Sequence, residues 1–359
     1  MAQQSSTADE PELQGTADEQ DPLDVLDLPQ LYQKPSVQVL VSVLADLSAA
    51  PLSWDATAND RPQRRKITSE GTPAYLTKIV SSPLAWIGDD EEKERIWELA
   101  SQRLSERSGR SGMGDITRTF TIPLAPTARS EPDTSSPTSK DECIEITLHE
   151  PAMQADNLGL KTWAASYLLA KRLPSLRPHF FPTRQPQAAI LELGSGTGLV
   201  GLAAAAMFKT HVILTDLPEI VPNLERNLQA NTAALERHGG SAETAVLDWS
   251  QPSNFSVTSA PNTFALILSA DPIYSPAHPQ LLVQAIDYHL SKTKEARVVI
   301  ELPLRDAYVA ERRDMRERMA KLGLELVDEG EEVGYDDWTS GDELTEVRCW
   351  WGVWGWAEV

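Results

Sequence analysis

Cysteine is scarce in this sequence of 359 residues, in which Cys143 and Cys349 are the only two. One pair of cysteines is too few for a disulfide framework, and too few for a zinc cluster built from cysteine ligands. We therefore predict a fold that depends on its apolar core and holds no metal ion.

Long apolar runs are also absent. The longest uninterrupted stretches, such as residues 199–208, are about half the length of a membrane-spanning helix. The first basic residue is Lys34, and nothing before it resembles the basic and apolar start of a secretory signal. On these grounds we expect a soluble cytoplasmic protein without a membrane partner.

Positive charge is in short supply, because 32 Lys and Arg residues stand against 53 Asp and Glu residues and the formal net charge is -21. Binding of phosphate backbones needs a clustered positive surface, so direct contact with nucleic acid is not expected. A cationic partner would suit this field, although acidity also serves solubility alone.

Basic residues are missing entirely from residues 1–28, whose acidic and polar composition cannot bury enough apolar surface to offset the entropy of ordering. We predict a disordered acidic tail there, followed by an accessory region over residues 29–142. Helical patterns cover residues 36–50 and 89–107, and the second opens on acids that suit a helix N-terminus.

Two runs of alternating or β-branched residues, 115–125 and 143–150, flank a stretch rich in proline, serine and threonine. They predict a β-hairpin with a mobile connection over residues 126–142. The second strand of this hairpin opens the main domain, which we place at residues 143–359.

Short apolar runs alternate with helical patterns after residue 185. The runs typical of strands are 188–193, 210–216, 242–249, 263–271 and 296–302. This alternation predicts an α/β fold of Rossmann-like type, with a parallel sheet between two layers of helices. Two last runs, 323–330 and 346–356, are joined by an acidic loop instead of a helix, which predicts an antiparallel last strand.

A glycine-rich loop follows the first of these strands, and ligands of open α/β sheets bind beyond the carboxyl ends of strands. The motif ELGSGTGLVG places Gly194, Gly196 and Gly198 there, where glycine lets the backbone turn tightly beside a helix N-terminus. Position 199 is leucine, where a dinucleotide fingerprint has its third glycine. The loop predicts a cofactor site without specifying the cofactor.

Two later strand ends carry further candidates. Asp216 ends the second strand, where a carboxylate can accept hydrogen bonds from both ribose hydroxyls. Trp249 ends the third strand, where an indole can flank an adenine. The alternatives are a helix cap for Asp216 and a packing aromatic for Trp249.

Adenine and ribose contacts would serve a dinucleotide or S-adenosylmethionine equally. A dinucleotide site must also hold a pyrophosphate, whereas the other site must hold an amino-acid zwitterion. Glu192 and the missing third glycine favour the zwitterion. A nicotinamide-dependent oxidoreductase is the alternative that Asp216 alone would permit.

Taken in order, these motifs resemble those of the seven-β-strand methyltransferases, and within them the family 16 protein-lysine methyltransferases. The similar segments are ILELGSGTGLVGLAAA, ILTDLPEIVPNLERNLQAN, LDW and LILSADPIYSPAHPQLL, preceded by LGLKTWAASYLLAKRL, which is similar to a tryptophan-containing helix that crosses the cofactor. The resemblance implies a seven-stranded sheet and the cofactor S-adenosyl-L-methionine. The expected cofactor-binding residues are Trp163, Glu192, Gly194, Ser195, Gly196, Asp216, Trp249 and Ala270.

The segment SADPIYSPAHP places Asp271 and Tyr274 after the fourth strand as the expected catalytic residues. Pro272 favours an extended conformation of Asp271. We predict that Asp271 captures and orients a lysine, directly or through its backbone carbonyl, and that Tyr274 walls the channel. Proton removal by Asp271 or through water stays open, an ordinary proline turn is the alternative, and His278 is expected to be a loop residue.

An aspartate at position 271 suits a cationic amine better than a neutral amide nitrogen. We therefore predict a protein-lysine N-methyltransferase that acts as a monomer on a protein substrate. The N-terminal extension and the phrase DPIYSPAHP are most similar to fungal members that methylate translation elongation factors, elongation factor 2 in particular. A small-molecule amine methyltransferase and a cofactor-binding scaffold without turnover are the alternatives.

Overall fold

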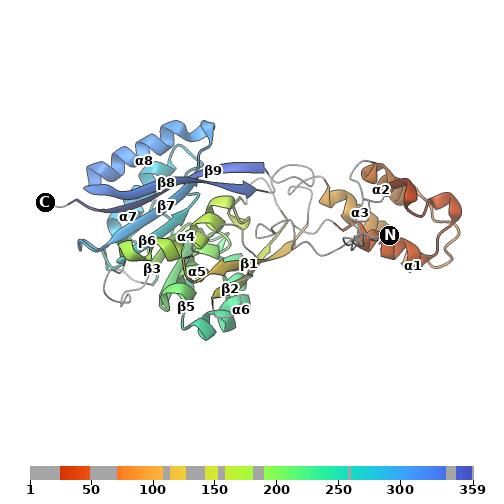
Figure 1. Ribbon diagram of the computed structural model, residues 1–359, viewed down its shortest axis with the longest axis horizontal. Helices are drawn as coiled ribbons and strands as arrows, with labels where there is room; N and C mark the ends of the chain where they lie inside the picture. Colours follow the sequence, from red (N-terminus) through yellow and green to blue (C-terminus); the bar gives the residue numbers. More distant parts are fainter. Residues whose placement is uncertain are drawn as a thin grey trace, which may run out of the picture. The chain divides into compact units, whose positions relative to one another are not determined.

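The computed structural model describes residues 25–48, 71–107, 114–126, 142–152, 158–180, 190–257, 260–336 and 345–357. They fall into two compact units, a helical unit over residues 25–47 and 71–100 and an α/β unit from residue 101 onward (Figure 1). Most of the predicted acidic tail and nearly all of the connection predicted over residues 126–142 lie outside the described residues. Where the structure describes the chain, it has no helix long and apolar enough to cross a bilayer.

The helical unit contains both helices that the sequence predicts. Its elements are η1 (Val25–Asp27), η2 (Leu31–Gln33), α1 (Val37–Asp46), α2 (Thr72–Ser81) and the first part of α3 (Asp90–Glu106). Ser36 caps α1 by accepting a hydrogen bond from the Val39 N–H at 3.4 Å. Three acids occupy the first turn of α3, where the helix dipole favours them.

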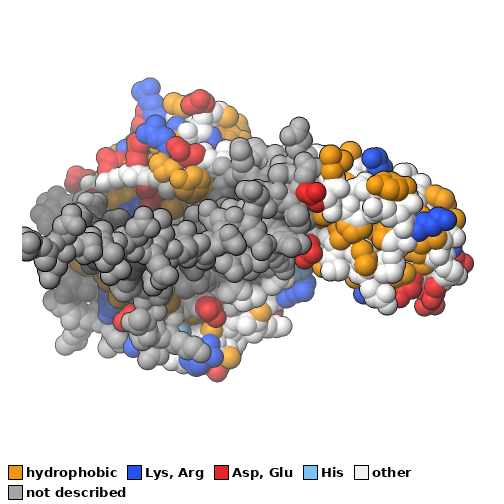
Figure 2. Space-filling view, turned by 45° about the vertical axis from the view of Figure 1, so that its right-hand side comes forward, with side chains coloured by type: hydrophobic (Ala, Val, Ile, Leu, Met, Phe, Trp, Pro, Cys, Tyr) orange, Lys and Arg blue, Asp and Glu red, His pale blue; other side chains and the backbone are white. Residues whose placement is uncertain are grey.

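Apolar side chains spaced one helical turn apart form the core of this unit. The fully buried ones include Leu40, Leu44, Leu76, Ile79, Ile96 and Ala100. Leu28 is only 6% exposed, so the predicted end of the tail at residue 28 lies inside the folded unit. Figure 2 shows apolar side chains on the surface of the unit as well, and Leu26 and Tyr32 are each 81% exposed.

The α/β unit is built on a seven-stranded sheet with the order β5-β4-β3-β6-β7-β9-β8 (Figure 1). The strands are β3 (Ile190–Leu193), β4 (His211–Asp216), β5 (Ser241–Val246), β6 (Leu266–Ala270), β7 (Arg297–Pro303), β8 (Leu324–Asp336) and β9 (Thr345–Trp356). The pairs from β5 to β7 are parallel, and β9 is antiparallel to both of its neighbours. The predicted Rossmann-like sheet with an antiparallel last strand is confirmed.

Helices cover both faces of the sheet. One core contains residues of α4 (Ala164–Phe180), α5 (Leu199–Phe208) and α6 (Val221–His238), and the other contains residues of α7 (His278–His289) and α8 (Val309–Leu322). All four residues of β3 are buried, as expected of a central strand covered on both sides. Short 3-10 turns, η4 (Leu158–Leu160) and η5 (Asp306–Tyr308), precede α4 and α8.

The predicted hairpin forms a separate antiparallel pair, β1 (Ile116–Pro123) with β2 (Cys143–Glu150). Its apolar side chains, Phe120 and Ile144 among them, lie in the same core as α4 and α5. β1 thus belongs to the compact unit that begins at residue 101, although the domain boundary that we predict at residue 143 falls between β1 and β2. Both strands stay with the α/β unit because their apolar face is buried there.

Asparagines on α6 form hydrogen bonds with backbone N–H and C=O groups on the outer edge of β2. Asn231 accepts from the Thr147 N–H at 2.9 Å and donates to the Thr147 carbonyl oxygen at 2.8 Å. Asn227 does the same with His149, at 2.8 and 3.1 Å, and Asn223 donates to the same carbonyl oxygen at 3.0 Å. Four residues of helix rise about 6 Å and two residues of strand about 6.8 Å, so the spacings match. We call these residues the asparagine ladder.

We expect the substitution Asn227→Ala to lower the free energy of unfolding by about 2 to 4 kcal/mol, because it leaves buried backbone groups without partners. Asn227 also donates to the Thr197 carbonyl oxygen at 3.0 Å, so three contacts are lost together. Urea unfolding followed by circular dichroism measures the change. The control is Gln229→Ala on the exposed face of α6, with an expected effect below about 0.5 kcal/mol. Equal effects of the two substitutions would contradict a role of the ladder.

Candidate functional site

The glycine-rich loop lies at the carboxyl end of β3, between β4 and β6 in the sheet. Gly194, Gly196 and Gly198 have φ values of 72°, 55° and 94°, in the left-handed region that favours glycine. A Cβ atom at Gly196 would lie 3.0 Å from the Gly159 carbonyl oxygen, so a side chain would also be crowded there. The sequence prediction of a tight glycine turn before α5 is confirmed.

Hydrogen bonds join this loop to the end of β4. The N–H groups of Gly194 and Ser195 both donate to the Thr215 carbonyl oxygen, at 3.0 and 2.9 Å. In return the Thr215 N–H donates to Ser195 Oγ at 3.0 Å. The Gly196 N–H donates to Asp216 Oδ2 at 2.8 Å. The loop is therefore fixed on the strand that carries the predicted ribose-binding carboxylate.

Asp216 holds the glycine loop and does not cap α6, whose N-cap is Ile220. Its Oδ1 accepts a hydrogen bond from the Leu217 N–H at 2.8 Å, in addition to the bond from Gly196 to Oδ2. Each carboxylate oxygen has a second acceptor position, and the side chain is partly exposed. Burial raises the pKa of Asp216 to about 6, and the two N–H groups work against that rise. The carboxylate can thus hold the loop and still accept from a ligand.

Glu192 lies beneath the loop and is almost completely buried. Its Oε2 accepts a hydrogen bond from the Gly201 N–H at 3.1 Å, in the first turn of α5. Burial raises the pKa of Glu192 to about 8, whereas hydrogen bonds from Ser195 and Gly201 lower it. A Cβ atom at Gly201 would come within 2.5 Å of the same carboxyl oxygen, so only glycine fits there. These contacts make Glu192 a support of the loop.

Three aromatic rings form a row from the glycine loop to the end of β6. A Cβ atom at Gly194 would lie 3.2 Å from the Trp249 indole, so this ring covers the loop closely. The His278 ring packs edge-on against Trp249, with centroids 6.0 Å apart, and against Tyr274, with centroids 4.2 Å apart. His278 Nδ1 lies 3.0 Å from the Pro272 carbonyl oxygen. His278 begins α7 and connects the two predicted halves of the site.

Tyr274 is 45% exposed at the far end of this row. Burial of the rest of the ring raises the pKa of Tyr274, and the charges of Asp216, Asp271 and Glu219 raise it further. These charges place the phenol within the field of both predicted carboxylates. The structure therefore brings Asp216, Tyr274 and Asp271 to one edge of the sheet.

The backbone of Asp271 differs from the sequence prediction. We expected an extended conformation before Pro272, but the φ value of Asp271 is 51°. Aspartate tolerates the left-handed region better than most residues, and the Asp271 N–H donates to the Glu301 carbonyl oxygen at 2.8 Å, which continues the pairing with β7. The turn directly after β6 thus determines the backbone conformation of Asp271, against the preference of a residue before proline for extended backbone.

The Asp271 carboxylate is held by Arg305, which lies two residues beyond the end of β7. Arg305 Nη1 donates to Oδ1 at 3.1 Å and Nη2 donates to Oδ2 at 2.8 Å. Burial raises the pKa of Asp271, and the charges of Arg305 and Lys161 work against that rise. An incoming ammonium would have to displace a guanidinium to reach both carboxylate oxygens.

Trp163 lies directly before α4 and is not part of it, which corrects the prediction of a tryptophan within the helix. Its carbonyl oxygen accepts hydrogen bonds from the first turn of α4, and its Nε1 donates to the Leu158 carbonyl oxygen at 3.1 Å. The Arg305 guanidinium carbon lies 5.3 Å from the ring centroid and Lys161 Nζ lies 4.6 Å from it. Trp163 therefore borders the Asp271 side of the site.

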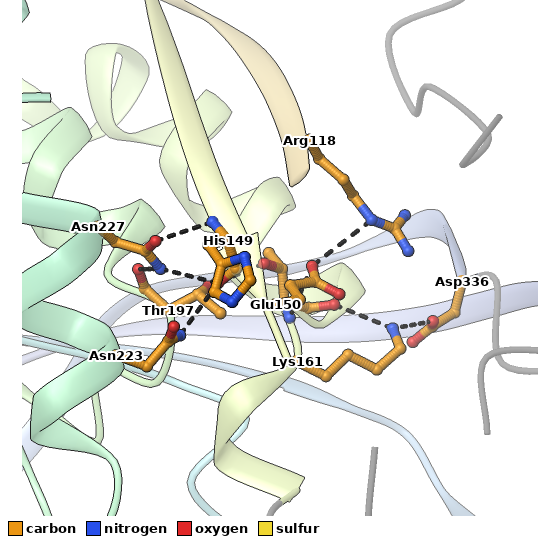
Figure 3. Close-up of polar contacts among 9 residues, drawn as sticks. Arg118, His149, Glu150, Lys161, Thr197, Asn223, Asn227 and Asp336 are labelled. Atoms are coloured by element: carbon orange, nitrogen blue, oxygen red, sulfur yellow. Dashed lines mark hydrogen bonds and ion pairs between the residues drawn. The ribbon is translucent and has the colours of Figure 1, made fainter. Parts of the chain in front are cut away.

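Buried charges fix the segment before Trp163 (Figure 3). Lys161 Nζ donates to Asp336 Oδ1 at 2.6 Å and to the Thr162 carbonyl oxygen at 3.0 Å. The Thr162 N–H donates to Glu150 Oε1 at 3.2 Å, and Arg118 Nε lies 3.6 Å from the same oxygen. Side chains from β1, β2 and β8 thus converge on Lys161 and Thr162, which precede α4.

The same segment is tied to the glycine loop. The hydroxyl oxygens of Thr162 and Thr197 lie 2.8 Å apart, and the Thr197 carbonyl oxygen accepts from Asn227. Figure 3 shows Thr197 between the asparagines of α6 and the charged groups around Lys161. One network of polar contacts therefore connects the loop, the hairpin and Trp163.

Ala270 is the last residue of β6 and pairs with Glu301, directly before Asp271. The predicted residues Gly194, Ser195, Gly196, Asp216, Trp249, Ala270, Asp271 and Tyr274 all follow or end β3, β4, β5 or β6. Sequence reasoning missed Arg305, although it follows the strand predicted over residues 296–302. The rule that selected Asp216, a polar side chain just beyond a strand end, would also have found it.

Comparison with known proteins decides the family. A model of a family described as lysine methyltransferase matches residues 140–315. The protein-lysine N-methyltransferase rrg1 of Schizosaccharomyces pombe is 30% identical over 336 residues, which cover 92% of this chain and 98% of rrg1. This chain belongs to the lysine methyltransferase family. Among the enzyme alternatives, membership favours methyl transfer over nicotinamide chemistry.

Two further relatives of this lysine methyltransferase carry similar names. The protein-lysine N-methyltransferase EFM2 of Saccharomyces cerevisiae is 33% identical over 305 residues, which cover 80% of this chain and 67% of EFM2. The EEF1A lysine methyltransferase 3 of Xenopus tropicalis is 29% identical over 147 residues, which cover 40% of this chain and 58% of that protein.

As a lysine methyltransferase, the protein uses S-adenosyl-L-methionine, and the groups in its site fit this cofactor. Asp216 offers carboxylate acceptor positions at the end of β4, where a ribose would bind. The indole of Trp249 lies beside Gly194, so an aromatic face is present next to the loop for an adenine to contact.

Glu192 gives a testable dependence of stability on pH. Its pKa rises from 4.5 to about 8 on folding, so the folded state keeps a proton that the unfolded chain releases between these values. The contribution of Glu192 is therefore fully present below pH 4.5 and is lost as the pH rises through 8. We expect the free energy of unfolding of Glu192→Gln to rise relative to that of the native protein by up to about 1.4 kcal/mol for each pH unit.

Urea unfolding of both proteins at intervals from pH 5.5 to pH 9 measures this difference. Glu325→Gln, at an exposed position of β8, reports the effect of removing one negative charge from the surface. A difference between Glu192→Gln and the native protein that stays constant over this range would refute the assignment.

Proposed function

We propose that this protein transfers methyl groups to a lysine of a translation elongation factor, with elongation factor 2 as the favoured target. The resemblance of the N-terminal extension and of DPIYSPAHP to fungal enzymes with such substrates supports this choice. The name of the Xenopus tropicalis relative, which refers to EEF1A, supports the wider class of elongation factors. The observation that carries the proposal is the position of Asp271 and Tyr274, after β6, at the same end of the sheet as Asp216, which ends β4 on the other side of β3.

The cofactor end of the site comprises the ends of β3, β4 and β5. We assign ribose binding to Asp216 and adenine contact to Trp249, and we assign the amino-acid tail to the backbone of Gly194, Ser195 and Gly196. Trp163, just before α4, and Ala270, at the end of β6, border the cofactor. Glu192 contributes through the loop, because its carboxyl contacts Ser195 and the Gly201 N–H.

When bound, S-adenosylmethionine supplies a methyl carbon to which the lysine Nζ lone pair bonds while the carbon–sulfur bond breaks and its electron pair stays on sulfur. The residues of this chain have to orient that nitrogen and keep it unprotonated. We assign orientation to Asp271, fixed by the Glu301 carbonyl oxygen and by Arg305, and to Tyr274 as the outer wall. A free lysine with a pKa near ~10.4 must first lose a proton to water.

The substrate is tested with purified elongation factor 2 and elongation factor 1A from cells that lack this protein, together with labelled S-adenosylmethionine. We expect the label on a lysine of elongation factor 2. We expect Asp271→Ala to slow the transfer by at least about 100-fold, because loss of orientation at the acceptor end raises the barrier. Asp287→Ala on the surface of α7 is the matched control, with unchanged transfer.

Label on elongation factor 1A alone would replace elongation factor 2 as the target and keep the substrate among the translation elongation factors. Absence of label from every lysine of both factors and of the whole lysate would refute the proposed function. Full activity of Asp271→Ala would refute the assignment of the acceptor end.

Asp216 predicts how binding of the cofactor product depends on pH. Its pKa of about 6 means that the carboxylate becomes protonated as the pH falls from 7.5 to 5.5, so it loses acceptor capacity toward the ribose. We expect the Kd for S-adenosylhomocysteine to rise about threefold to tenfold over this range. Calorimetric titration at four pH values measures it. Asp216→Asn should bind more weakly at every pH with a flat profile, and an equally steep profile in this variant would assign the titration to another group.

A further inference from the structure

We propose that Arg305 is a positioning residue for methyl transfer, which compensates the charge of Asp271 and turns a positive charge toward the acceptor amine, so that the amine stays unprotonated. The inference rests on the proposed function, because it concerns the lysine nitrogen at the end of β6. It changes the expected task of the Asp271 carboxylate from capture of a cation to the fixing of a guanidinium.

The difference in burial between the two partners carries the inference. The Asp271 side chain is 6% exposed and the Arg305 side chain is 34% exposed, so the guanidinium covers the carboxylate from outside. Both carboxylate oxygens are occupied by Nη1 and Nη2 of the same guanidinium. A nitrogen that approaches from the solvent therefore meets the positive member of the pair first.

Arg305 is held in this position from several sides. Its carbonyl oxygen accepts a hydrogen bond from Arg312 Nη1 at 2.6 Å, and the preceding Leu304 N–H donates to the Arg348 carbonyl oxygen at 2.8 Å. The guanidinium also lies 5.3 Å from the centroid of the Trp163 ring, which attracts a cation. Removal of one partner from a buried bidentate pair is costly, so the pair favours retention of Arg305 when a substrate binds.

The other groups around Asp271 do not cancel this positive charge. Lys161, before α4, adds a second cation that is paired with Asp336. Cys349 on β9 lies in the field of Asp271 and Arg305, and burial raises the pKa of its thiol, so it stays neutral. Tyr274 is raised in pKa and neutral as well, and burial lowers the pKa of His278, which favours the uncharged ring.

Glu301 on β7 completes this environment. Burial raises the pKa of Glu301 well above its ordinary value, the charge of Glu332 raises it further, and the charge of Arg172 works against this rise. The groups at the end of β6 thus comprise the Asp271–Arg305 pair, with the guanidinium on its outer side, and the Lys161–Asp336 pair, while Asp216 and Glu219 contribute negative charge near Tyr274. A cation near an amine lowers the pKa of that amine, which is the direction that methyl transfer needs.

The test is the pH profile of kcat with saturating cofactor and elongation factor 2, or with whichever lysate protein the native enzyme methylates. In Arg305→Gln the uncompensated carboxylate stabilises the ammonium form, so we expect the acid limb of the profile to move up by about one pH unit. Activity at pH 7.5 then falls roughly tenfold and recovers to within about threefold of native at pH 9.5, without a rise in KM.

Two variants serve as controls. Arg305→Lys keeps the charge without the planar fork, so its acid limb should stay within about 0.3 pH unit of native even where its kcat is lower. Arg313→Gln removes the same charge from the exposed face of α8 and should leave the profile unchanged. Circular dichroism verifies that each variant is folded. Where Arg305→Gln does not fold, the pH profile of Arg305→Lys is compared with the native profile.

A loss in Arg305→Gln that is equal at all pH values, or an unshifted acid limb, overturns the inference while the proposed function stands. So does a rise of kcat/KM at pH 7.5, which would mean that Arg305 occupies the place of the substrate ammonium. A displaced acid limb in Arg305→Lys equal to that of Arg305→Gln also overturns it. A native protein that methylates no lysine in any sample overturns both proposals.

Discussion

The hydrogen bonds between the glycine loop and the end of β4 are the constraint on which the rest of the site depends. They set the loop at the height of Asp216, so that one carboxylate supports the backbone while its side chain stays partly exposed. Every other part of the site is positioned against this loop: Trp249 covers it, Glu192 supports it from below, and Thr197 connects it to the segment before α4. Two of these bonds join backbone groups alone and so do not depend on side-chain identity, whereas the bonds to Ser195 Oγ and to Asp216 Oδ2 require those side chains.

Much of the α/β unit could be predicted from the sequence, because its strands are short apolar runs separated by helical patterns. The rule that ligands bind beyond strand ends then selected the residues at the ends of β3 to β6. Local chemistry sufficed for these, since glycine at positive φ and a carboxylate after a strand are properties of a few adjacent residues. The direction of β9 was predictable for the same reason, from an acidic connection that carries no helical pattern.

The remainder depends on contacts between segments far apart in the chain. Lys161 and Asp336 are separated by 175 residues, and no local pattern indicates that they meet. The conformation of Asp271 is decided by its bond to Glu301 on the neighbouring strand, and the position of Trp163 by charges from the hairpin and from β8. The grouping of both hairpin strands with the α/β unit depends likewise on a core that only the folded chain defines. Such contacts alter what a residue does. Asp271, which was expected to attract a cation from solvent, is already paired with Arg305.

The asparagine ladder of α6 has a consequence for association of this chain with others. A short two-stranded hairpin offers its outer strand as a template for a third strand, and exposed edges of this kind promote aggregation and strand exchange. On β2 the outward N–H and C=O groups of Thr147 and His149 are already occupied by amides that carry both a donor and an acceptor. The same amides fix the register of the strand, because a slip by one residue would present inward-facing groups to the helix. A helix with asparagine at every fourth position thus occupies the place of a third strand beside β2, which closes this edge of the hairpin against addition of a foreign chain.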